Sequence, residues 1–438
     1  MSTDIVPVII IINISLLFFF YKKLSLNGHY RYSFAFLNTL YIAYAFIFFP
    51  FVTYFFNISN PFKSIDLNGN YYIQANFLIT VYLLSLNVGI LISNYYYKDR
   101  SPILKTIFNF DFIKGKGILL YTFLLYSLLK IFIFIYLLNI YNPVEIIQNR
   151  SLFDSYYIKY NLAYIIDPLN GICTFIFIIL LFEYLNNKRY SLLFLVLFIH
   201  LYSSSLYGSR AQFILVFIYL FIVYYIINKK IKITYILLLL LGSTVIFAFM
   251  GSLRTENDFI FDVNFLFKVL YYRSDYIPGL TKLISYISND EIGHYYGQSI
   301  LDFIFSFLPR SIIEYKPHSI EVILTYILFG TKKWTLAFGG IGEMFYNFSY
   351  QGVFIWFIFV GFFIDRLNKL FINSINAKKY IISSFLLSTP FYLHGWNMGV
   401  NVSPTRKFII IYSFILINFI MIKVFQSALN TYNSKNIV

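Results

Sequence analysis

Long apolar stretches alternate with short polar ones along almost the whole chain. A helix that crosses a bilayer needs about 20 mostly apolar residues, and about eleven windows of the sequence meet this requirement. The windows lie near Ile5–Tyr21, Phe34–Phe56, Tyr72–Ser93, Gly117–Ile140, Leu162–Leu185, Tyr190–Leu206, Ala211–Asn228, Ile233–Met250, Tyr346–Phe363, Tyr380–Val400 and Phe408–Phe425. The pattern predicts an all-α, polytopic membrane bundle that forms a single integral membrane domain over residues 1–438.

One connection, roughly residues 251–345, is much longer than the others and joins the eighth and ninth predicted helices. Connections of this length without secondary structure are usually functional. Residues 258–279 place apolar side chains at helical spacing, which predicts an amphipathic helix on the membrane surface. His318–Gly330 is apolar but too short to span, so we expect a second interfacial or re-entrant segment.

Composition agrees with a membrane protein, because only 12% of the residues are charged and 59% are hydrophobic. Soluble domains carry about 25% charged residues. The formal net charge of +15 would suggest nucleic acid as a partner of a soluble protein. Here most Lys and Arg of the short connections fall in the odd-numbered ones, which predicts that those connections are cytoplasmic. We therefore expect no nucleic-acid partner, and we expect the long connection to face outward.

Two further features bound the possibilities. The single cysteine, Cys173, excludes a disulfide within the chain and a cysteine-based metal site. The first apolar segment is followed by Lys22 and Lys23 instead of a small-residue cleavage site, so we expect it to stay in the membrane.

Several arginines fall on the predicted outward side, against the usual charge bias. They are Arg210, Arg254, Arg273, Arg310 and Arg406. Two of them, Arg210 and Arg406, lie where helices are predicted to begin, and free N–H groups at a helix start bind anions. Arg310 lies between Pro309 and Pro317, together with Lys316. The guanidinium fork matches phosphate oxygens in pairs, so a lipid-linked diphosphate is one fitting ligand. Contact with lipid headgroups is the alternative for each arginine taken alone.

Four elements of the sequence resemble a known family. GSRAQ at Gly208–Gln212, LPRSIIEYKP at Leu308–Pro317, GGIGEMFYNFSYQG at Gly339–Gly352 and the late Arg406 resemble the Wzy-type O-antigen or capsule repeat-unit polymerases. The resemblance covers mainly residues 208–406. The family commonly has glycine near Ser349, where this chain has Ser349-Tyr350.

The resemblance implies a glycosyltransferase-C-like helical fold in the bacterial inner membrane. It implies an enzyme that uses undecaprenyl-diphosphate-linked oligosaccharides at the periplasmic face, with membrane lipids and a chain-length regulator protein as further partners. The growing chain would move onto the non-reducing end of a new lipid-linked unit, with inversion at the anomeric carbon.

Such a transfer needs stabilisation of the departing diphosphate and a base for the acceptor hydroxyl. The chain contains no Asp-x-Asp pair of the kind that holds a metal in many glycosyltransferases, so we expect no metal and no cofactor. We expect the catalytic residues to include Arg210, Arg310 and Arg406. The candidate bases are Glu343, His294, Asp275 and His394.

Further substrate contacts are expected from Arg254, Arg273, Lys316 and Tyr272, together with His294 and Asp275. Simpler structural roles exist for the acid and histidine candidates. Glu343 could only complement a helix dipole, His294 could be an ordinary hydrogen-bonded loop residue, and Asp275 could pair with Arg273.

Two other functions fit parts of the pattern. An O-antigen ligase would share the long outward connection and its arginines. A flippase for lipid-linked sugars would belong to a different class, in which repeated halves and polar groups near the middle of the membrane are typical. The sequence shows no such repeat, which favours the polymerase.

Overall fold

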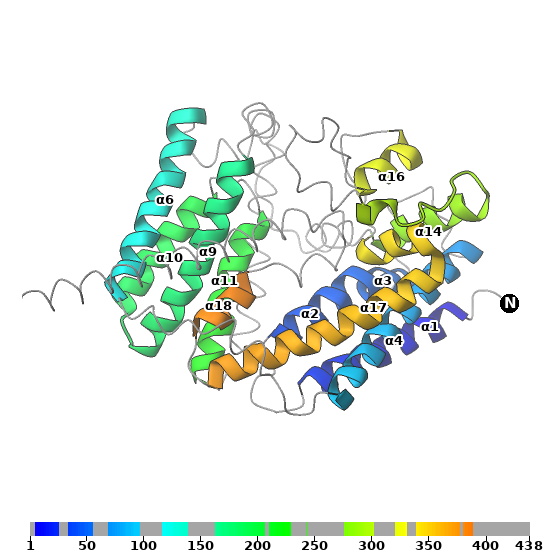
Figure 1. The fold of residues 1–438 in the computed structure, drawn as a ribbon, viewed down its shortest axis with the longest axis horizontal. Coiled ribbons are helices and arrows are strands. Elements are labelled where there is room, and N and C mark those ends of the chain that lie inside the picture. Colours follow the sequence, from blue (N-terminus) through cyan, green and yellow to red (C-terminus); the bar gives the residue numbers. More distant parts are fainter. Residues whose placement is uncertain are drawn as a thin grey trace, which may run out of the picture. The chain divides into compact units, whose positions relative to one another are not determined.

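The computed structural model describes residues 5–25, 34–55, 69–96, 116–138, 163–205, 210–228, 242, 276–301, 320–330, 339–376 and 380–388. Within these ranges every regular element is a helix (Figure 1). Five of the described helices are long and apolar enough to cross a membrane, namely Ile5–Leu24, Asn38–Phe55, Asn70–Tyr96, Leu169–Asn186 and Gly339–Ile375. Three shorter apolar helices cover Leu119–Ile133, Tyr190–Ser204 and Leu215–Asn228. The prediction of an all-α membrane protein is confirmed, and the count of about eleven spans stays a prediction.

The chain divides into two compact units. The first unit contains α1 (Ile5–Leu24), α2 (Phe34–Ile42), the π-helix η1 (Ala43–Phe48), α3 (Phe49–Phe55), α4 (Asn70–Tyr96), α14 (Tyr276–Ser288), α16 (Ile320–Phe329) and most of α17 (Gly339–Asn376). The second contains α6 (Lys116–Leu138), α9 (Ala163–Asn186), α10 (Tyr190–Ser205), α11 (Arg210–Asn228) and α18 (Tyr380–Ser388). The predicted windows near Ile233–Met250 and Phe408–Phe425 lie outside the described residues, apart from residue 242.

Polar side chains join α1 to α4 inside the first unit. The Asn13 amide donates to the backbone oxygen of Asn76 at 3.3 Å, and the Thr80 hydroxyl donates to Asn13 Oδ1 at 2.8 Å. Further along both helices, the Asn87 amide donates to the Leu16 carbonyl at 3.1 Å. The residue numbers of the hydrogen-bonded partners increase together along the two helices, so α1 and α4 run parallel. Hydrogen bonds between helices contribute to association in a bilayer, where lipid tails leave little hydrophobic drive.

Two glycines bring α4 and α17 into close contact. A Cβ atom built on Gly89 would lie 2.1 Å from the backbone oxygen of Ile358, and one on Gly361 would lie 2.2 Å from that of Leu86. Only glycine therefore fits at these two positions, and small residues commonly allow such approaches in membrane helices. The rings of Tyr82 and Phe357 meet edge to face in the same interface. The hydrogen-bonded pair Ser93 and Asp365 lies further toward the C-terminus of both helices than the pair Tyr82 and Phe357, so α17 is parallel to α4.

The second predicted span contains a π-helical turn. Pro50 lies in the first turn of α3 and has no N–H to donate. Its ring would clash with the carbonyl four residues earlier in a regular helix. The wider turn of η1, over Ala43–Phe48, comes immediately before this position, which is where a helix adjusts to such an interruption.

The second unit is organised around α9, which packs against α6, α10, α11 and α18 (Figure 1). Within Leu169–Asn186, 89% of the residues are buried, which is why this helix lies at the centre of its unit. The buried ammonium of Lys130 on α6 donates to Asn170 Oδ1 at 2.9 Å. His200 on α10 is also buried and stacks on Phe177, with 4.1 Å between the ring centroids.

Candidate functional site

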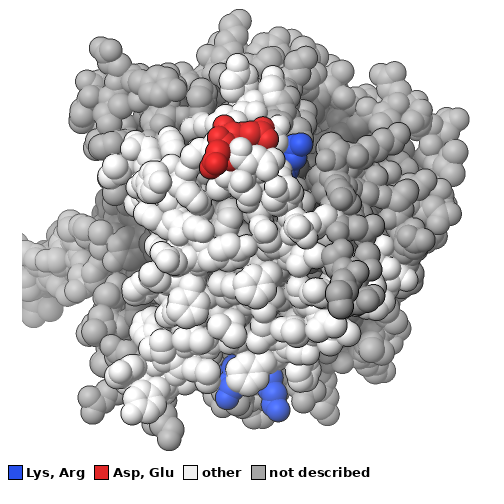
Figure 2. All heavy atoms as spheres, turned by 90° about the vertical axis from the view of Figure 1, so that its right-hand side faces the viewer, with Lys and Arg blue, Asp and Glu red and all other residues white. Residues whose placement is uncertain are grey.

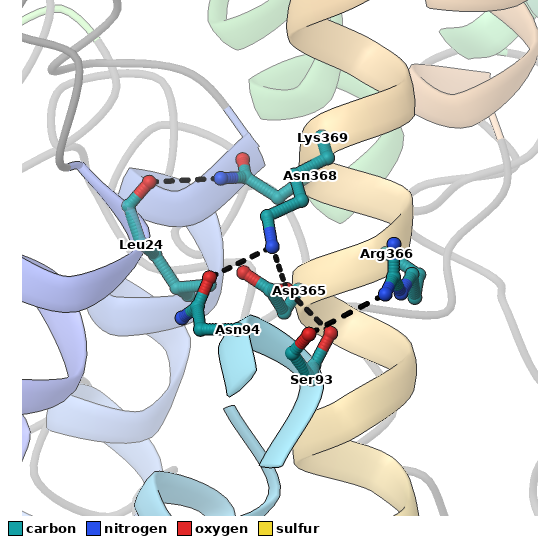
Figure 3. Close-up of polar contacts among 7 residues, drawn as sticks. All are labelled: Leu24, Ser93, Asn94, Asp365, Arg366, Asn368 and Lys369. Atoms are coloured by element: carbon teal, nitrogen blue, oxygen red, sulfur yellow. Dashed lines mark hydrogen bonds and ion pairs between the residues drawn. The ribbon is translucent and has the colours of Figure 1, made fainter. Parts of the chain in front are cut away.

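A polar cluster ties three parallel helices together at one end of the first unit (Figure 3). The buried carboxylate of Asp365 on α17 accepts from the Ser93 hydroxyl at 2.6 Å and pairs with Lys369 at 2.8 Å. Lys369 also donates to Asn94 Oδ1 at 2.7 Å, and the Asn368 amide donates to the Leu24 carbonyl at 2.8 Å. The cluster therefore places the C-terminal ends of α1 and α4 beside the same turns of α17.

This end of the unit carries most of its described basic residues. Lys22 and Lys23 close α1, and Arg366 and Lys369 lie on α17 within the cluster. The exposed acids Asp290 and Glu291 follow α14 instead. Figure 2 shows acidic groups near the upper end with a basic group beside them, further basic groups at the lower end, and uncharged surface between the two ends.

A break in α17 lies toward the opposite end of the helix from this cluster. The backbone is non-helical at Phe348 (φ −141°, ψ 20°) and at Ser349 (φ 58°, ψ −155°). The second conformation is one that glycine adopts readily and that other residues rarely adopt. The resemblance leads us to expect glycine near this position, and Ser349 has a glycine-like backbone there.

The break leaves a backbone carbonyl available to a second segment of the chain. In an uninterrupted helix the Tyr346 carbonyl would accept from the N–H group four residues later. Here it accepts from the Tyr295 N–H at 3.0 Å and lies 3.1 Å from His294 Nδ1. The rings of Tyr295 and Tyr346 stack with their centroids 5.3 Å apart. The segment after α14 is therefore held against the first part of α17.

Asn347 fastens the same two segments through its side chain. Its Oδ1 accepts from the Gly297 N–H at 2.8 Å, and its Nδ2 donates to the Ser299 hydroxyl at 2.7 Å and to the Glu343 carbonyl at 2.8 Å. Gly297 has φ of 87°, and a Cβ there would lie 2.9 Å from the Phe348 ring. A fully buried amide with three partners fixes a segment firmly, because leaving any of them unpaired is costly.

The structure brings two predicted site residues to this junction, Glu343 and His294. Glu343 lies in the first turns of α17, as expected, but only 1% of it is exposed. His294 is partly exposed, and the centroid of its ring lies 6.2 Å from that of Tyr296 and 6.3 Å from that of Phe345. Of the two candidate bases, His294 is the one with access to a ligand.

Arg210 is the first residue of α11, so the predicted helix start is confirmed at this position. The other predicted site residues lie outside the described residues: Arg254, Tyr272, Arg273, Asp275, Arg310, Lys316, His394 and Arg406. Whether the arginines share one cavity stays a prediction. Among the described residues, no group of three or more His, Cys, Asp or Glu side chains could hold a metal ion.

Sequence reasoning missed Asn347, the residue that joins the two segments. Its partner Gly297 is 50 residues away in the chain. A sequence signal was present, since Asn347 is a polar residue inside the predicted apolar span Tyr346–Phe363. Nothing local to that asparagine indicates which distant N–H group it would bind.

A comparison with known protein families identifies the family of this chain. The model of the family described as O-antigen polysaccharide polymerase Wzy matches residues 4–428, nearly the whole chain. The chain belongs to the Wzy family. No match was found among curated proteins or solved structures. Wzy membership and the apolar helices together make this a multi-pass membrane protein of O-antigen polysaccharide synthesis. The resemblance carried by Gly208–Gln212, Leu308–Pro317 and Gly339–Gly352 is thereby confirmed and extends to the early helices.

Proposed function

We propose that this Wzy family member polymerises undecaprenyl-diphosphate-linked oligosaccharide repeat units at the periplasmic face of the inner membrane, by inverting and metal-independent glycosyl transfer. The family match over residues 4–428 is the observation that carries the polymerase activity. The substrate, the membrane face and the independence from metal are further parts of the proposal.

The charge distribution of the first unit supports the periplasmic face. Lys22, Lys23, Arg366 and Lys369 gather at one end, and basic residues next to membrane spans favour the cytoplasm. The junction of His294 with α17 lies toward the other end. With the basic end in the cytoplasm, His294 and Glu343 belong to the outward half of the protein.

In the proposed reaction an acceptor hydroxyl attacks the anomeric carbon of the growing chain, and the bond to the lipid diphosphate breaks. Negative charge grows on the departing diphosphate and needs fixed positive groups. Arg210, Arg310 and Arg406 take this role, because guanidinium groups bind phosphate oxygens in pairs without a metal. In the same proposal, Arg254, Arg273 and Lys316 contribute further positive charge for substrate binding.

The test supplies purified, lipid-reconstituted protein with lipid-linked repeat units as the sole substrate. We expect a ladder of lengthened glycans that forms equally well in EDTA and in magnesium. Elongation only after addition of a core lipid would identify a ligase, and movement of the substrate across the bilayer without elongation would identify a flippase. Strict dependence on magnesium would contradict the metal-independent mechanism.

Arginine variants test the proposed diphosphate site. Arg310→Ala should abolish long glycan at normal protein abundance, and Arg210→Ala and Arg406→Ala should do the same. Arg310→Lys is the matched control, because it keeps the charge and loses the planar fork. We expect it to recover only part of the activity. Full activity in all three alanine variants would eliminate the site.

A further inference from the structure

The hydrogen bond from His294 fixes which of its ring nitrogens carries a proton. A backbone carbonyl can only accept, so Nδ1, which lies 3.1 Å from the Tyr346 oxygen, must donate. In the neutral ring the lone pair then resides on Nε2. The carbonyl is available at this place because α17 is broken at Phe348 and Ser349. The break in the helix thus orients an imidazole whose outer nitrogen is a proton acceptor.

An exposed aromatic ring lies beside this imidazole. Tyr296 is 80% exposed, and its centroid is 6.2 Å from that of His294. Its backbone has φ of 45°, an unusual value for a residue with a side chain. The next residue, Gly297, is held by Asn347 and by the Phe348 ring. A strained backbone that is fixed on one side and presents an aromatic ring to the outside is typical of a binding surface.

We propose that His294 and Tyr296 form the acceptor-sugar subsite, in which the Tyr296 ring stacks on the terminal sugar and His294 Nε2 takes the proton of the attacking hydroxyl. This inference rests on the proposed function. The hydroxyl proton moves to Nε2 as the oxygen lone pair forms the bond to the anomeric carbon. The bond from that carbon to the diphosphate oxygen breaks, and its electron pair leaves with the lipid diphosphate. The imidazolium then returns its proton to solvent.

The structure separates His294 from the other described base candidate. Glu343 is 1% exposed. Its backbone carbonyl accepts from the amide of Asn347, the residue that also binds Gly297 and Ser299, so the backbone of Glu343 helps to hold the segment after α14. Asn347 touches no substrate in this arrangement and is a positioning residue for the subsite. The competing explanation for His294 is purely structural, namely that its ring only satisfies the Tyr346 carbonyl.

The variant His294→Asn distinguishes the two roles. The asparagine amide can still donate to the Tyr346 carbonyl in place of Nδ1, but it cannot accept a proton. We expect a rate of elongation about 100 to 10,000 times lower than wild type, with an unchanged melting temperature in detergent. Elongation within about twofold of wild type would overturn the role of the imidazole as base.

A second variant covers the case in which His294→Asn does not fold. His294→Ala leaves a space for free imidazole, which should restore part of the elongation rate of the reconstituted full chain. A folded alanine variant with no recovery in imidazole would overturn the proposal. Absence of elongation by wild-type protein would overturn the proposed function, and this subsite with it.

Binding to Tyr296 is measured without the reaction. The probe is the free repeat-unit oligosaccharide, released from its lipid diphosphate, and its binding to the full chain is followed by saturation-transfer NMR. Tyr296→Ala should weaken binding at least about tenfold, which corresponds to about 1.4 kcal/mol. Tyr296→Phe keeps the ring and should bind like wild type. Equal binding by wild type and Tyr296→Ala would refute the sugar-stacking role while leaving polymerisation by wild type intact.

Discussion

Alanine at Gly89 should force α4 and α17 apart. The new Cβ would lie 2.1 Å from the Ile358 oxygen, whereas ordinary contacts begin near 3.4 Å. The two helices would therefore separate by about 1.3 Å, since backbone atoms on both sides leave no flexible group to move aside. A shift of that size would also stretch the 2.6 Å hydrogen bond between Ser93 and Asp365 beyond bonding distance.

The energy of this change has three parts. Overpacking costs about 1–3 kcal/mol, and loss of a buried hydrogen bond costs about 1–3 kcal/mol. Alanine's higher helix propensity offsets about 1 kcal/mol. We expect Gly89→Ala to lower the free energy of unfolding by about 1–5 kcal/mol.

Thermal unfolding in detergent, followed by loss of the monodisperse chromatographic peak, measures the effect. Gly293→Ala is the matched control, because a Cβ there would meet nothing within 4 Å. Gly361→Ala should destabilise by a similar amount, since its Cβ would lie 2.2 Å from the Leu86 oxygen. The double variant should cost less than the sum of the two, because the first substitution already separates the helices. A wild-type melting temperature for Gly89→Ala would refute the close crossing.

Three further predictions concern other features. Ser349→Gly should stabilise the protein by about 1 kcal/mol, since φ of 58° with ψ of −155° suits glycine; a lower melting temperature would contradict this. Asp365→Leu should lower the free energy of unfolding by about 3 kcal/mol, which is more than Lys369→Ala should cost, because the Asp365 side chain is 3% exposed and the Lys369 side chain 29% exposed. Denaturation midpoints in the opposite order would contradict the stabilising role of this cluster. In intact cells an impermeant thiol reagent should label Asp290→Cys and spare Lys23→Cys, because the proposed orientation places the basic end in the cytoplasm. The reverse labelling pattern would contradict that orientation.

Hydropathy predicted the existence of most described helices because a bilayer imposes a length and an apolar composition on every span. It predicted their ends less well. The window at Tyr346–Phe363 became α17 over Gly339–Asn376, which extends past the apolar stretch at both ends. Polar residues such as Asp365 and Asn368 lie inside this helix because α1 and α4 supply their partners. A hydropathy average over one stretch of sequence carries no information about partners on other helices.

The candidate site was predictable only in part. The positions of Arg210 at a helix start and of Glu343 in the first turns of α17 follow from local sequence signals. The orientation of His294 does not, since it depends on a break at Ser349 and on a carbonyl 52 residues away. Contacts between residues so far apart in the chain depend on how whole helices pack, and the residues next to His294 do not indicate them.

The parallel course of α1, α4 and α17 has a consequence for how the chain can change over evolution. Two spans that cross in the same direction must be separated by an odd number of crossings. The five apolar windows predicted between α4 and α17 satisfy this parity. Spans between them can therefore be gained or lost only in pairs, because a single insertion would carry His294 and its loop to the wrong side of the membrane.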